Sequence, residues 1–321
     1  MPLAVERPYV LEPRGEDAHV LGQEITFQLV VGGLVLLLVL GLLVAIVIRQ
    51  LRHRTPEEAP PDLDEERGQR WIVLGGLVLP LVVLTAVVVM SARSFLAVDD
   101  AGGARAGVER TVEVVAHRWW WEVRYPDAHA STANEVVLPV GQPVRLRLRT
   151  KDVIHSLWIP QLDRKADMIP GRVTYLRLTA ERPGEYRGLC AEFCGLQHAK
   201  MAFRVRVLAP GAFADWLAAA RLPAARPATT SARAGARVFQ DAGCAVCHTI
   251  AGTAASGEVG PELTHLASRR SIAAETLPNT RGNLAGWISD PQHVKRGVLM
   301  PRTELGGREL QQLLDYLEGL R

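Results

Sequence analysis

Two long apolar runs dominate the N-terminal third of this 321-residue chain. In residues 25–48 only Thr26 and Gln28 interrupt a series of apolar residues and glycines, and a second run covers residues 71–90. A helix of ~20 apolar residues crosses the hydrocarbon core of a membrane, so both runs are long enough. The first is too long for the apolar part of a signal peptide, and no small-residue cleavage site follows it. The pattern predicts an N-terminal arm and a two-helix transmembrane hairpin within residues 1–92.

Basic residues at the ends of the two runs indicate how the hairpin is oriented. The segment between the runs contains a cluster of arginines, namely Arg49, Arg52, Arg54, Arg67 and Arg70. Lysine and arginine near membrane ends favour the cytoplasmic side, whereas acidic residues contribute little to orientation. We therefore predict a protein of the bacterial cytoplasmic membrane that crosses the lipid twice. Both termini, and everything after residue 90, would lie on the outer face.

Short segments of alternating apolar and polar residues follow the second run. In one of them Val144, Leu146 and Leu148 alternate with three arginines, which are expected on a solvated face. Similar segments lie at residues 112–115, 119–125, 135–138, 172–178 and 202–208. Strands of this kind separated by Gly/Pro turns are typical of a sandwich or barrel. We predict an antiparallel β-sandwich over residues 93–210.

The chain changes character again after the last of these strands. Residues 211–220 are predicted to form a short helix, and a Pro/Ala/Thr-rich linker of semi-extended type completes the segment 211–231. The remaining residues, 232–321, have helical periodicity. Their first helix would contain residues 235–241 and their last residues 304–320. An all-α domain is therefore predicted at the C-terminus.

Charge and cysteine content narrow the chemistry. The net charge of +3 is too small to indicate a nucleic-acid partner, and the sequence has no basic tract interleaved with aromatic residues. All four cysteines lie in two close pairs, Cys190/Cys194 and Cys244/Cys247. A secreted disulfide framework would scatter its cysteines, so the two pairs favour metal binding or haem attachment.

The densest group of candidate ligands lies near the end of the predicted sandwich. Cys190, Cys194, His198 and Met201 follow one another at intervals of four, four and three residues, and His155 lies upstream. Soft sulfur combined with imidazole suits copper, zinc or iron and matches magnesium or calcium poorly. The sequence therefore predicts a site for a soft metal ion.

Three interpretations of this cluster compete. Two cysteines and two histidines would satisfy a tetrahedral zinc ion, and a disulfide between the two cysteines is the second interpretation. The third is a copper centre, since copper electron-transfer sites use a weak axial thioether such as that of Met201, which zinc would leave without a role. Two thiolates four residues apart can bridge two copper ions, each capped by one histidine. Such a cluster would change little on reduction, as fast electron transfer requires.

Several motifs together resemble subunit II of the cytochrome c oxidases over roughly residues 20–210. They are the membrane hairpin, a tryptophan-rich strand, H-S-x-x-I-P, D-x-I-P-G-R and C-x-E-x-C-x-x-x-H-x-x-M. In that family the sandwich is a cupredoxin-like domain that carries a dinuclear copper A centre. The resemblance implies a complete ligand set: Cys190 and Cys194 as bridges, His155 and His198 as caps, and Met201 and the main-chain carbonyl of Glu192 as weak ligands.

The same resemblance implies roles for residues outside the copper ligands. The Glu192 side chain would reach a magnesium ion at the boundary with subunit I, which Asp167 and Arg172 would also line. Trp119 would be the residue through which electrons enter. The neighbouring residues Trp120 and Trp121 are expected to pack in the core.

The C-terminal domain contains a second cofactor motif, Cys244-Ala-Val-Cys247-His248. This is the attachment signature of c-type haem, in which the two thiols bond to the vinyl groups and the histidine becomes the proximal iron ligand. A zinc or redox C-x-x-C site is the alternative, but the immediately following histidine favours haem. Residues 232–321 resemble class I cytochrome c.

The distal haem ligand is inferred by exclusion. Met300 is the only methionine of the C-terminal domain, and its rivals are His265 and His293. Methionine paired with histidine raises the haem potential, which suits a donor to an oxidase. The dipeptide Gly260–Pro261 would carry the loop beneath the haem, and Trp287 is expected to pack beside it.

Both resemblances together imply the electron-entry subunit of a respiratory haem-copper terminal oxidase with a fused cytochrome c, the caa-type. This cytochrome-c oxidase subunit would pass electrons from external cytochrome c through haem c and copper A to subunit I. Oxygen would be reduced to water there, with proton translocation. Subunit III and other oxidase subunits are further implied partners. Two alternatives remain: a nitric oxide reductase that uses copper A, and a membrane-anchored protein that binds and delivers copper.

Overall fold

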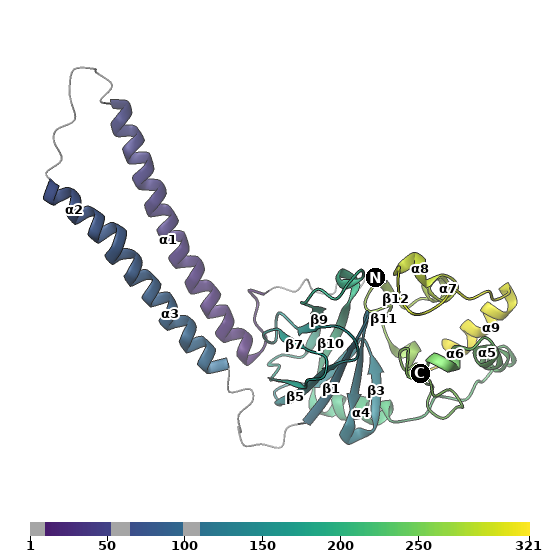
Figure 1. Cartoon of the computed structure of the whole chain (residues 1–321). Helices are drawn as coiled ribbons and strands as arrows, with labels where there is room; N and C mark the ends of the chain where they lie inside the picture. The colour runs from purple at the N-terminus through teal and green to yellow at the C-terminus, as the bar shows by residue number, and fades with distance from the viewer. Residues whose placement is uncertain (1–9, 53–64, 99–109) are drawn as a thin grey trace. The chain divides into compact units, whose positions relative to one another are not determined.

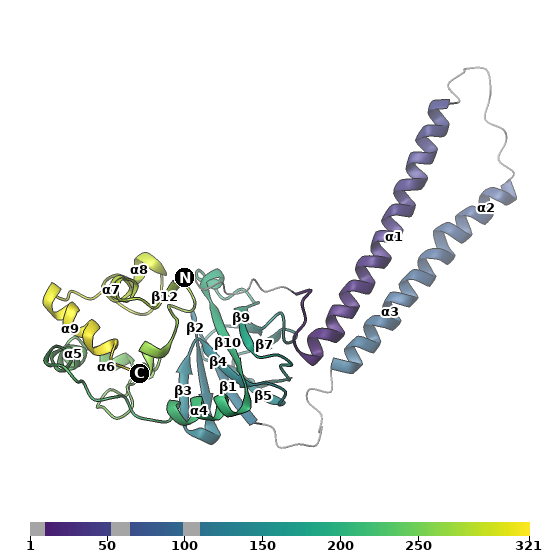
Figure 2. The same cartoon turned by 180° about the vertical axis from the view of Figure 1, so that it is seen from behind.

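The computed structural model describes residues 10–52, 65–98 and 110–321 (Figures 1 and 2). Part of the predicted N-terminal arm, part of the loop between the apolar runs, with Arg54, and most of the connector after the second run lie outside the described residues. The chain divides into two units, one formed by residues 19–100 and the other by residues 1–18 with 101–321.

Both apolar runs form long helices. The first is α1 (Glu16–Arg52), and the second is continuous through α2 (Glu65–Val73), the π-helical segment η1 (Leu74–Val78) and α3 (Leu79–Val98). Both are long and apolar enough to cross a membrane, with hydropathies of 3.2 and 2.9. They extend beyond the predicted 25–48 and 71–90 because the polar flanking residues continue the helical hydrogen bonding. Glu24 accepts hydrogen bonds from the hydroxyls of Ser91 and Ser94 and so joins α1 to α3.

The predicted sandwich is present as two five-stranded sheets, with strand orders β3-β2-β1-β5-β8 and β4-β10-β9-β6-β7. The first sheet consists of β1 (Arg110–His117), β2 (Trp120–Tyr125), β3 (Ala130–Ala133), β5 (Val144–Thr150) and β8 (Thr174–Leu178). The second consists of β4 (Glu135–Pro139), β6 (His155–Trp158), β7 (Ala166–Met168), β9 (Gly184–Cys190) and β10 (Ala202–Leu208). Short 3₁₀ turns occur at η3 (Pro126–Ala128) and η4 (His198–Lys200).

The sheets are mixed, which differs from the purely antiparallel pairing that we predicted. Strand β1 pairs with β5 in parallel, and β10 pairs with β4 in parallel, while the other strand pairs of the sandwich are antiparallel. A parallel pair needs a crossover connection. Here β2, β3 and β4 lie between β1 and β5 in the chain, and alternation of apolar residues alone does not reveal such a crossover.

The core of the sandwich follows the predicted alternation. Val144, Leu146 and Leu148 are fully buried, whereas Arg145 and Arg149 are exposed. Burying each aliphatic side chain contributes ~1.5–3 kcal/mol relative to exposing it. The packed core therefore provides a rigid support for the loops at the strand ends.

The segment after β10 contains the predicted short helix, α4 (Pro210–Ala220), with Phe213 and Leu217 buried. The C-terminal domain consists of α5 (Thr230–Asp241), α6 (Cys244–Cys247), η5 (Leu266–Ser268), β11 (Ser271–Ile272), β12 (Leu277–Pro278), α7 (Arg281–Ser289), α8 (Pro291–Val294) and α9 (Gly307–Leu317). Helix α9 is shorter than predicted, since residues 301–306 form no helix. At Gly235 of α5 a Cβ would lie 1.9 Å from the carbonyl oxygen of Gln312, so only glycine allows α5 and α9 to approach this closely.

Candidate metal and haem sites

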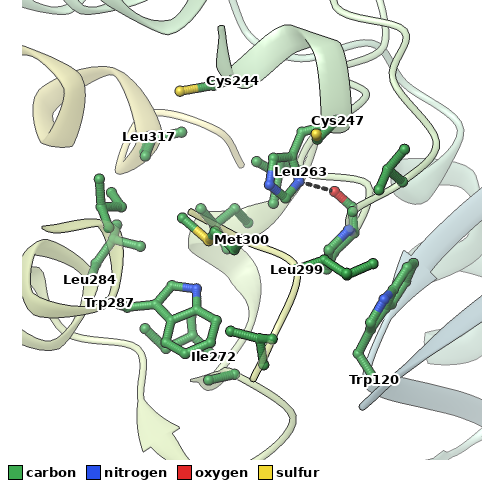
Figure 3. Close-up of a pocket in the computed structure, with 18 of the residues that line it drawn as sticks. Trp120, Cys244, Cys247, Leu263, Ile272, Leu284, Trp287, Leu299, Met300 and Leu317 are labelled. Carbon is green, nitrogen blue, oxygen red and sulfur yellow. Dashed lines mark hydrogen bonds between the residues drawn. The ribbon is translucent and has the colours of Figure 1, made fainter. Parts of the chain in front are cut away.

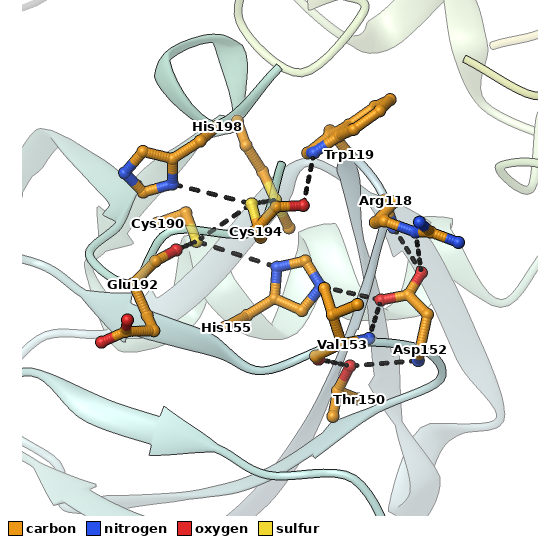
Figure 4. Close-up of polar contacts among 11 residues, drawn as sticks. Arg118, Trp119, Thr150, Asp152, Val153, His155, Cys190, Glu192, Cys194 and His198 are labelled. Carbon is orange, nitrogen blue, oxygen red and sulfur yellow. Dashed lines mark hydrogen bonds and ion pairs between the residues drawn. The ribbon is translucent and has the colours of Figure 1, made fainter. Parts of the chain in front are cut away.

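The structure brings the two thiols of the first cysteine pair together at the end of the sandwich (Figure 4). The Sγ atoms of Cys190 and Cys194 lie 3.8 Å apart, and both cysteines are buried free thiols. Each thiol has its own imidazole. His155 Nδ1 lies 3.7 Å from Cys190 Sγ, and His198 Nδ1 lies 3.6 Å from Cys194 Sγ. The arrangement is therefore a near-symmetric set of two sulfurs and two nitrogens.

The two weaker ligand candidates lie beside the same thiols. The sulfur of Met201 is 3.7 Å from Cys194 Sγ, and the main-chain carbonyl of Glu192 is 3.2 Å from Cys190 Sγ. One thioether thus lies at one thiol and one carbonyl at the other. All six predicted copper-site residues lie in this one cluster. By contrast Asp167 and Arg172 are exposed side chains at or after β7.

Residues 190–201 form a loop whose two ends are joined by a main-chain hydrogen bond. Strand β9 ends at Cys190, and strand β10 begins just after Met201, whose carbonyl accepts a hydrogen bond from the Cys190 amide at 3.0 Å. Gly195 has φ 112°, and a Cβ there would lie 3.2 Å from the ring of Trp119. A glycine therefore allows the loop to pass tightly between its cysteine and this tryptophan.

An acidic residue orients the first imidazole. Asp152 Oδ1 lies 2.9 Å from His155 Nε2, and the same carboxylate accepts hydrogen bonds from the main-chain amides of Arg118 and Val153. Burial disfavours a charged imidazole, but the hydrogen bonds to Asp152 and Cys190 outweigh it and raise the pKa of His155. With Nε2 held by the carboxylate, Nδ1 points at the thiols, as a metal-binding histidine requires.

We expect replacement of Asp152 by alanine to weaken copper binding. Loss of a carboxylate that orients a ligating histidine lowers metal affinity ~10–100-fold. The affinity can be measured by chelator competition on the purified full-length chain. The exposed carboxylate Asp167 serves as the control, and Asp167→Ala should leave the affinity unchanged. Equal affinities for both variants would contradict the orienting role of Asp152.

The electrostatics of the thiol pair fit a cationic occupant. The contact between the two thiols lowers the pKa of Cys190, although burial opposes this, and the same contact together with burial raises the pKa of Cys194. Two thiolates this close repel one another, so the pair retains one proton unless a cation neutralises both. A coordinating metal deprotonates its thiol ligands. The donor set of soft sulfur, imidazole and thioether therefore fits copper.

The three consecutive tryptophans occupy different environments. Trp119 is 8% exposed, and its Nε1 donates a hydrogen bond of 3.0 Å to the carbonyl of Cys194. Trp121 is fully buried against Phe203, with ring centroids 5.0 Å apart, as predicted for a core residue. The prediction that Trp120 packs in the core is wrong. Its ring is partly exposed, stacks on His117 at 4.2 Å and lines the haem cavity described next.

The second cysteine pair opens onto a cavity of about 230 Å³ (Figure 3). Cys244, Cys247, His248 and Met300 all line it, and most of the remaining lining is apolar. Trp287 also lines the cavity, whereas neither His265 nor His293 is among the lining residues. An apolar cavity with two thiols, an imidazole and a thioether on its walls fits a covalently attached haem.

The candidate proximal histidine, His248, contacts the predicted loop at Gly260–Pro261. His248 Nδ1 lies 2.7 Å from the carbonyl of Pro261, and burial lowers the pKa of His248, which keeps the imidazole neutral. At Gly260 a Cβ would lie 2.5 Å from the His248 ring, so only glycine permits this approach. The hydrogen bond at Nδ1 leaves Nε2 available as a ligand.

Two residues of these sites were not predicted from the sequence. Asp152 lies three residues before His155, and an acidic residue at that spacing is a signal that could have been used. Lys295 also lines the haem cavity and is 1% exposed. Its neighbours come from distant parts of the chain, so no local pattern marks it.

Comparison with known proteins agrees with these two sites. Residues 129–208 match the family "Cytochrome C oxidase subunit II, periplasmic domain", and residues 232–321 match the family "Cytochrome c". Cytochrome c oxidase subunit 2 of Alkalihalophilus pseudofirmus is 29% identical over 99% of this chain and 92% of its own length. The Bacillus subtilis protein of the same name is 28% identical over 86% of this chain and 81% of its own.

One solved structure matches part of this chain. The crystal structure of the periplasmic domain of subunit II of cytochrome oxidase from Bradyrhizobium japonicum is 29% identical to this chain. It covers 37% of this chain and 97% of the solved one, with a TM-score of 0.35.

Fold, sites and sequence matches together define a subunit of a haem-copper oxidase, with a cupredoxin-like domain joined to a cytochrome c domain. Residues 129–208 form a periplasmic domain of the cytochrome c oxidase subunit II type and residues 232–321 a cytochrome c domain, and relatives similar over nearly the whole chain are named cytochrome c oxidase subunit 2. These two domains imply copper A and haem c as cofactors. The apolar helices indicate a membrane anchor.

Proposed function

We propose that this chain is the electron-entry subunit of a respiratory haem-copper terminal oxidase. It would accept electrons from cytochrome c and deliver them, by way of haem c and dinuclear copper A, to subunit I for reduction of oxygen to water coupled to proton translocation. We assign the N-terminal arm and the membrane hairpin to residues 1–92, the copper domain to 93–210, the helix and linker to 211–231 and the cytochrome c domain to 232–321.

One observation carries this proposal: the symmetric pairing of two thiols with two imidazoles. Each Sγ of Cys190 and Cys194 has one histidine Nδ1 within 3.7 Å. Two cysteines and two histidines could also hold one tetrahedral zinc ion, but zinc would leave the thioether of Met201 without a role. Two thiols that each have their own imidazole, with a thioether beside them, would suit a copper pair. When bound, the copper pair and the haem supply reversible one-electron redox chemistry. The remaining tasks belong to the side chains of this chain.

Those side chains keep the ligands in place and exclude water. His155 is fully buried and oriented by Asp152, and Cys190 and Cys194 are 8% and 4% exposed. Rigid ligands on a packed scaffold reduce the rearrangement that accompanies electron transfer. This supports an electron-transfer role better than copper delivery, because a carrier must release its ion.

A short connection between the haem cavity and the copper site supports electron transfer from the haem to the copper centre. Trp120 lines the haem cavity, and Trp119 is its neighbour in the chain. The Nε1–H of Trp119 then donates to the carbonyl of Cys194 at 3.0 Å. Covalent bonds and one hydrogen bond therefore join the haem cavity to a copper ligand. We propose this as the electron route, with Trp119 as the residue of entry into the copper site.

We further propose which partners the copper domain contacts in the assembled oxidase. The half-buried Glu192 would ligate a magnesium ion at the boundary with subunit I, where the exposed Asp167 and Arg172 would also lie. Subunit III and a cytochrome c donor complete the partners. The arginines at the facing ends of the two helices, Arg49 and Arg52 in α1 and Arg67 and Arg70 in α2, favour a hairpin that crosses the bacterial membrane twice, with the copper and haem domains outside.

Oxidase assays on the purified complex that contains this chain test the function. Reduced cytochrome c should be oxidised with consumption of oxygen, and protons should leave reconstituted vesicles. Reduction of nitric oxide in place of oxygen would favour the nitric oxide reductase. A chain that holds copper but passes no electrons to any oxidase would favour copper delivery.

A further inference from the structure

A buried lysine joins the cytochrome c domain to the copper domain. Lys295 follows α8, is 1% exposed, and its Nζ donates to the carbonyls of Trp119 at 2.8 Å, Lys200 at 2.8 Å and Ala273 at 3.2 Å. An ammonium group has three N–H donors, so these three carbonyls satisfy it completely. Two of them belong to the copper domain, and one belongs to the cytochrome c domain.

This arrangement is unusual because a buried charge is costly. Removing an ammonium group from water is unfavourable unless hydrogen bonds replace those to the solvent. Burial, with a smaller contribution from the charge on Lys200, lowers the pKa of Lys295 to about 7. Three carbonyls from distant parts of the chain replace the hydrogen bonds that the ammonium group of Lys295 would otherwise make to water. A lysine on the surface would keep its bonds to water and would not need these carbonyls.

Two neighbouring hydrogen bonds strengthen the same contact. The side-chain amide of Gln197 donates to the carbonyl of Arg296 at 2.7 Å, and the ammonium of Lys200 donates to the carbonyl of Val294 at 2.6 Å. Gln197 and Lys200 flank the copper-ligand candidate His198. The segment 294–296 of the cytochrome c domain therefore lies directly on the copper-ligand loop.

A strained turn forms a second contact between the domains. Ala273, Ala274 and Glu275 all have left-handed φ angles, of 54°, 57° and 62°, which are unfavourable for residues with a Cβ. Such strain persists where the surroundings impose it. Here the turn presents the Ala273 carbonyl to Lys295 and the buried Glu275 carboxylate to Arg204 of the copper domain at 3.3 Å.

We propose that Lys295, together with the turn 273–275, locks the cytochrome c domain onto the copper-ligand loop in one position. Lys295 is then a positioning residue, and its benefit for electron transfer rests on the proposed function. The lock also covers the entry tryptophan, since Trp119 is 8% exposed and lies against Gly297 of the cytochrome c domain. An external donor therefore delivers electrons at the cytochrome c domain and not at Trp119.

Hydrogen exchange on the full-length, cofactor-loaded chain tests the lock. In Lys295→Met we expect amide exchange of residues 195–201 and 292–298 to rise at least ~10-fold, since three carbonyls lose their donor. Transfer from haem to copper after photochemical reduction of the haem should slow, with both optical spectra unchanged. The control is Arg308→Met, which removes an exposed charge on α9 and should change none of these readouts.

The outcomes separate the lock from the proposed function. Unchanged exchange in Lys295→Met would overturn the lock, whatever happens to the transfer rate. If exchange increases in Lys295→Met while the wild-type chain itself shows no electron transfer from haem to copper, that pair of results would support the lock and contradict the proposed function. If Lys295→Met does not fold, Glu275→Gln should raise exchange of residues 271–278 at least ~3-fold through loss of a buried charged hydrogen bond. No rise there would also overturn the proposal.

Salt dependence provides a further readout. Exposed charge pairs are screened by salt, whereas buried contacts are screened much less. We expect exchange at residues 292–298 of the wild-type chain to be insensitive to added salt. A rise with salt would mean that surface charges hold the domain, which contradicts the lock.

Discussion

Replacing Cys194 with serine is expected to abolish the dinuclear copper centre while leaving the haem in place. The Cys194 sulfur lies within 3.8 Å of Cys190 Sγ, His198 Nδ1 and Met201 Sδ, so its loss disrupts the set on every side. Even residues that only orient a ligand change metal affinity ~10–100-fold, so loss of a bridging ligand should cost at least ~100-fold. Copper content and electron delivery to the oxidase should fall together.

The second cysteine pair supplies a matched control for this experiment. Cys247→Ser should lose one thioether bond to the haem and keep two copper ions, the reverse of the result for Cys194→Ser. Copper content and the optical spectrum of covalent haem, measured on the same preparations, distinguish the two. Retention of both copper ions in Cys194→Ser would show that Cys194 is not a bridging ligand.

Replacing Met300 is expected to produce the second large effect, a fall in the haem reduction potential. Met300 lines the same cavity as His248, whose Nδ1 is hydrogen-bonded to the carbonyl of Pro261, and a methionine ligand raises the potential relative to a second histidine. Met300→His should therefore lower the potential. For a one-electron step each ~59 mV of change alters the equilibrium constant tenfold. Potentiometric titration of the haem band measures the shift.

The rival histidines serve as controls for the distal ligand. His265→Ala and His293→Ala should leave the potential and the haem spectrum unchanged, because neither residue lines the cavity. Met300→Ala should open a coordination position that binds added imidazole. A normal spectrum in Met300→Ala together with an altered one in His265→Ala would assign the distal position to His265 instead.

The sequence was most informative where function demands a fixed chemical pattern. The intervals between Cys190, Cys194, His198 and Met201 placed four candidate ligands on one loop, and the structure brings them together with His155 from another strand. Alternation in residues 144–149 likewise predicted which side chains are buried. Both patterns are local, so neighbouring residues suffice to reveal them.

Features that depend on distant contacts could not be predicted in the same way. The parallel pairs β1–β5 and β4–β10 arise from crossovers that local alternation does not encode. Trp120 has the composition of a core residue but faces the haem cavity, because the cytochrome c domain packs on its strand end. Lys295 bonds to a carbonyl 176 residues away in the chain, and no spacing rule connects them.

The most direct test is a metal count combined with electron spin resonance on the purified, oxidised full-length chain. We predict two copper ions per chain, with one unpaired electron shared equally between both copper nuclei. One zinc ion, one copper ion, or a disulfide between Cys190 and Cys194 in the mature complex would contradict it.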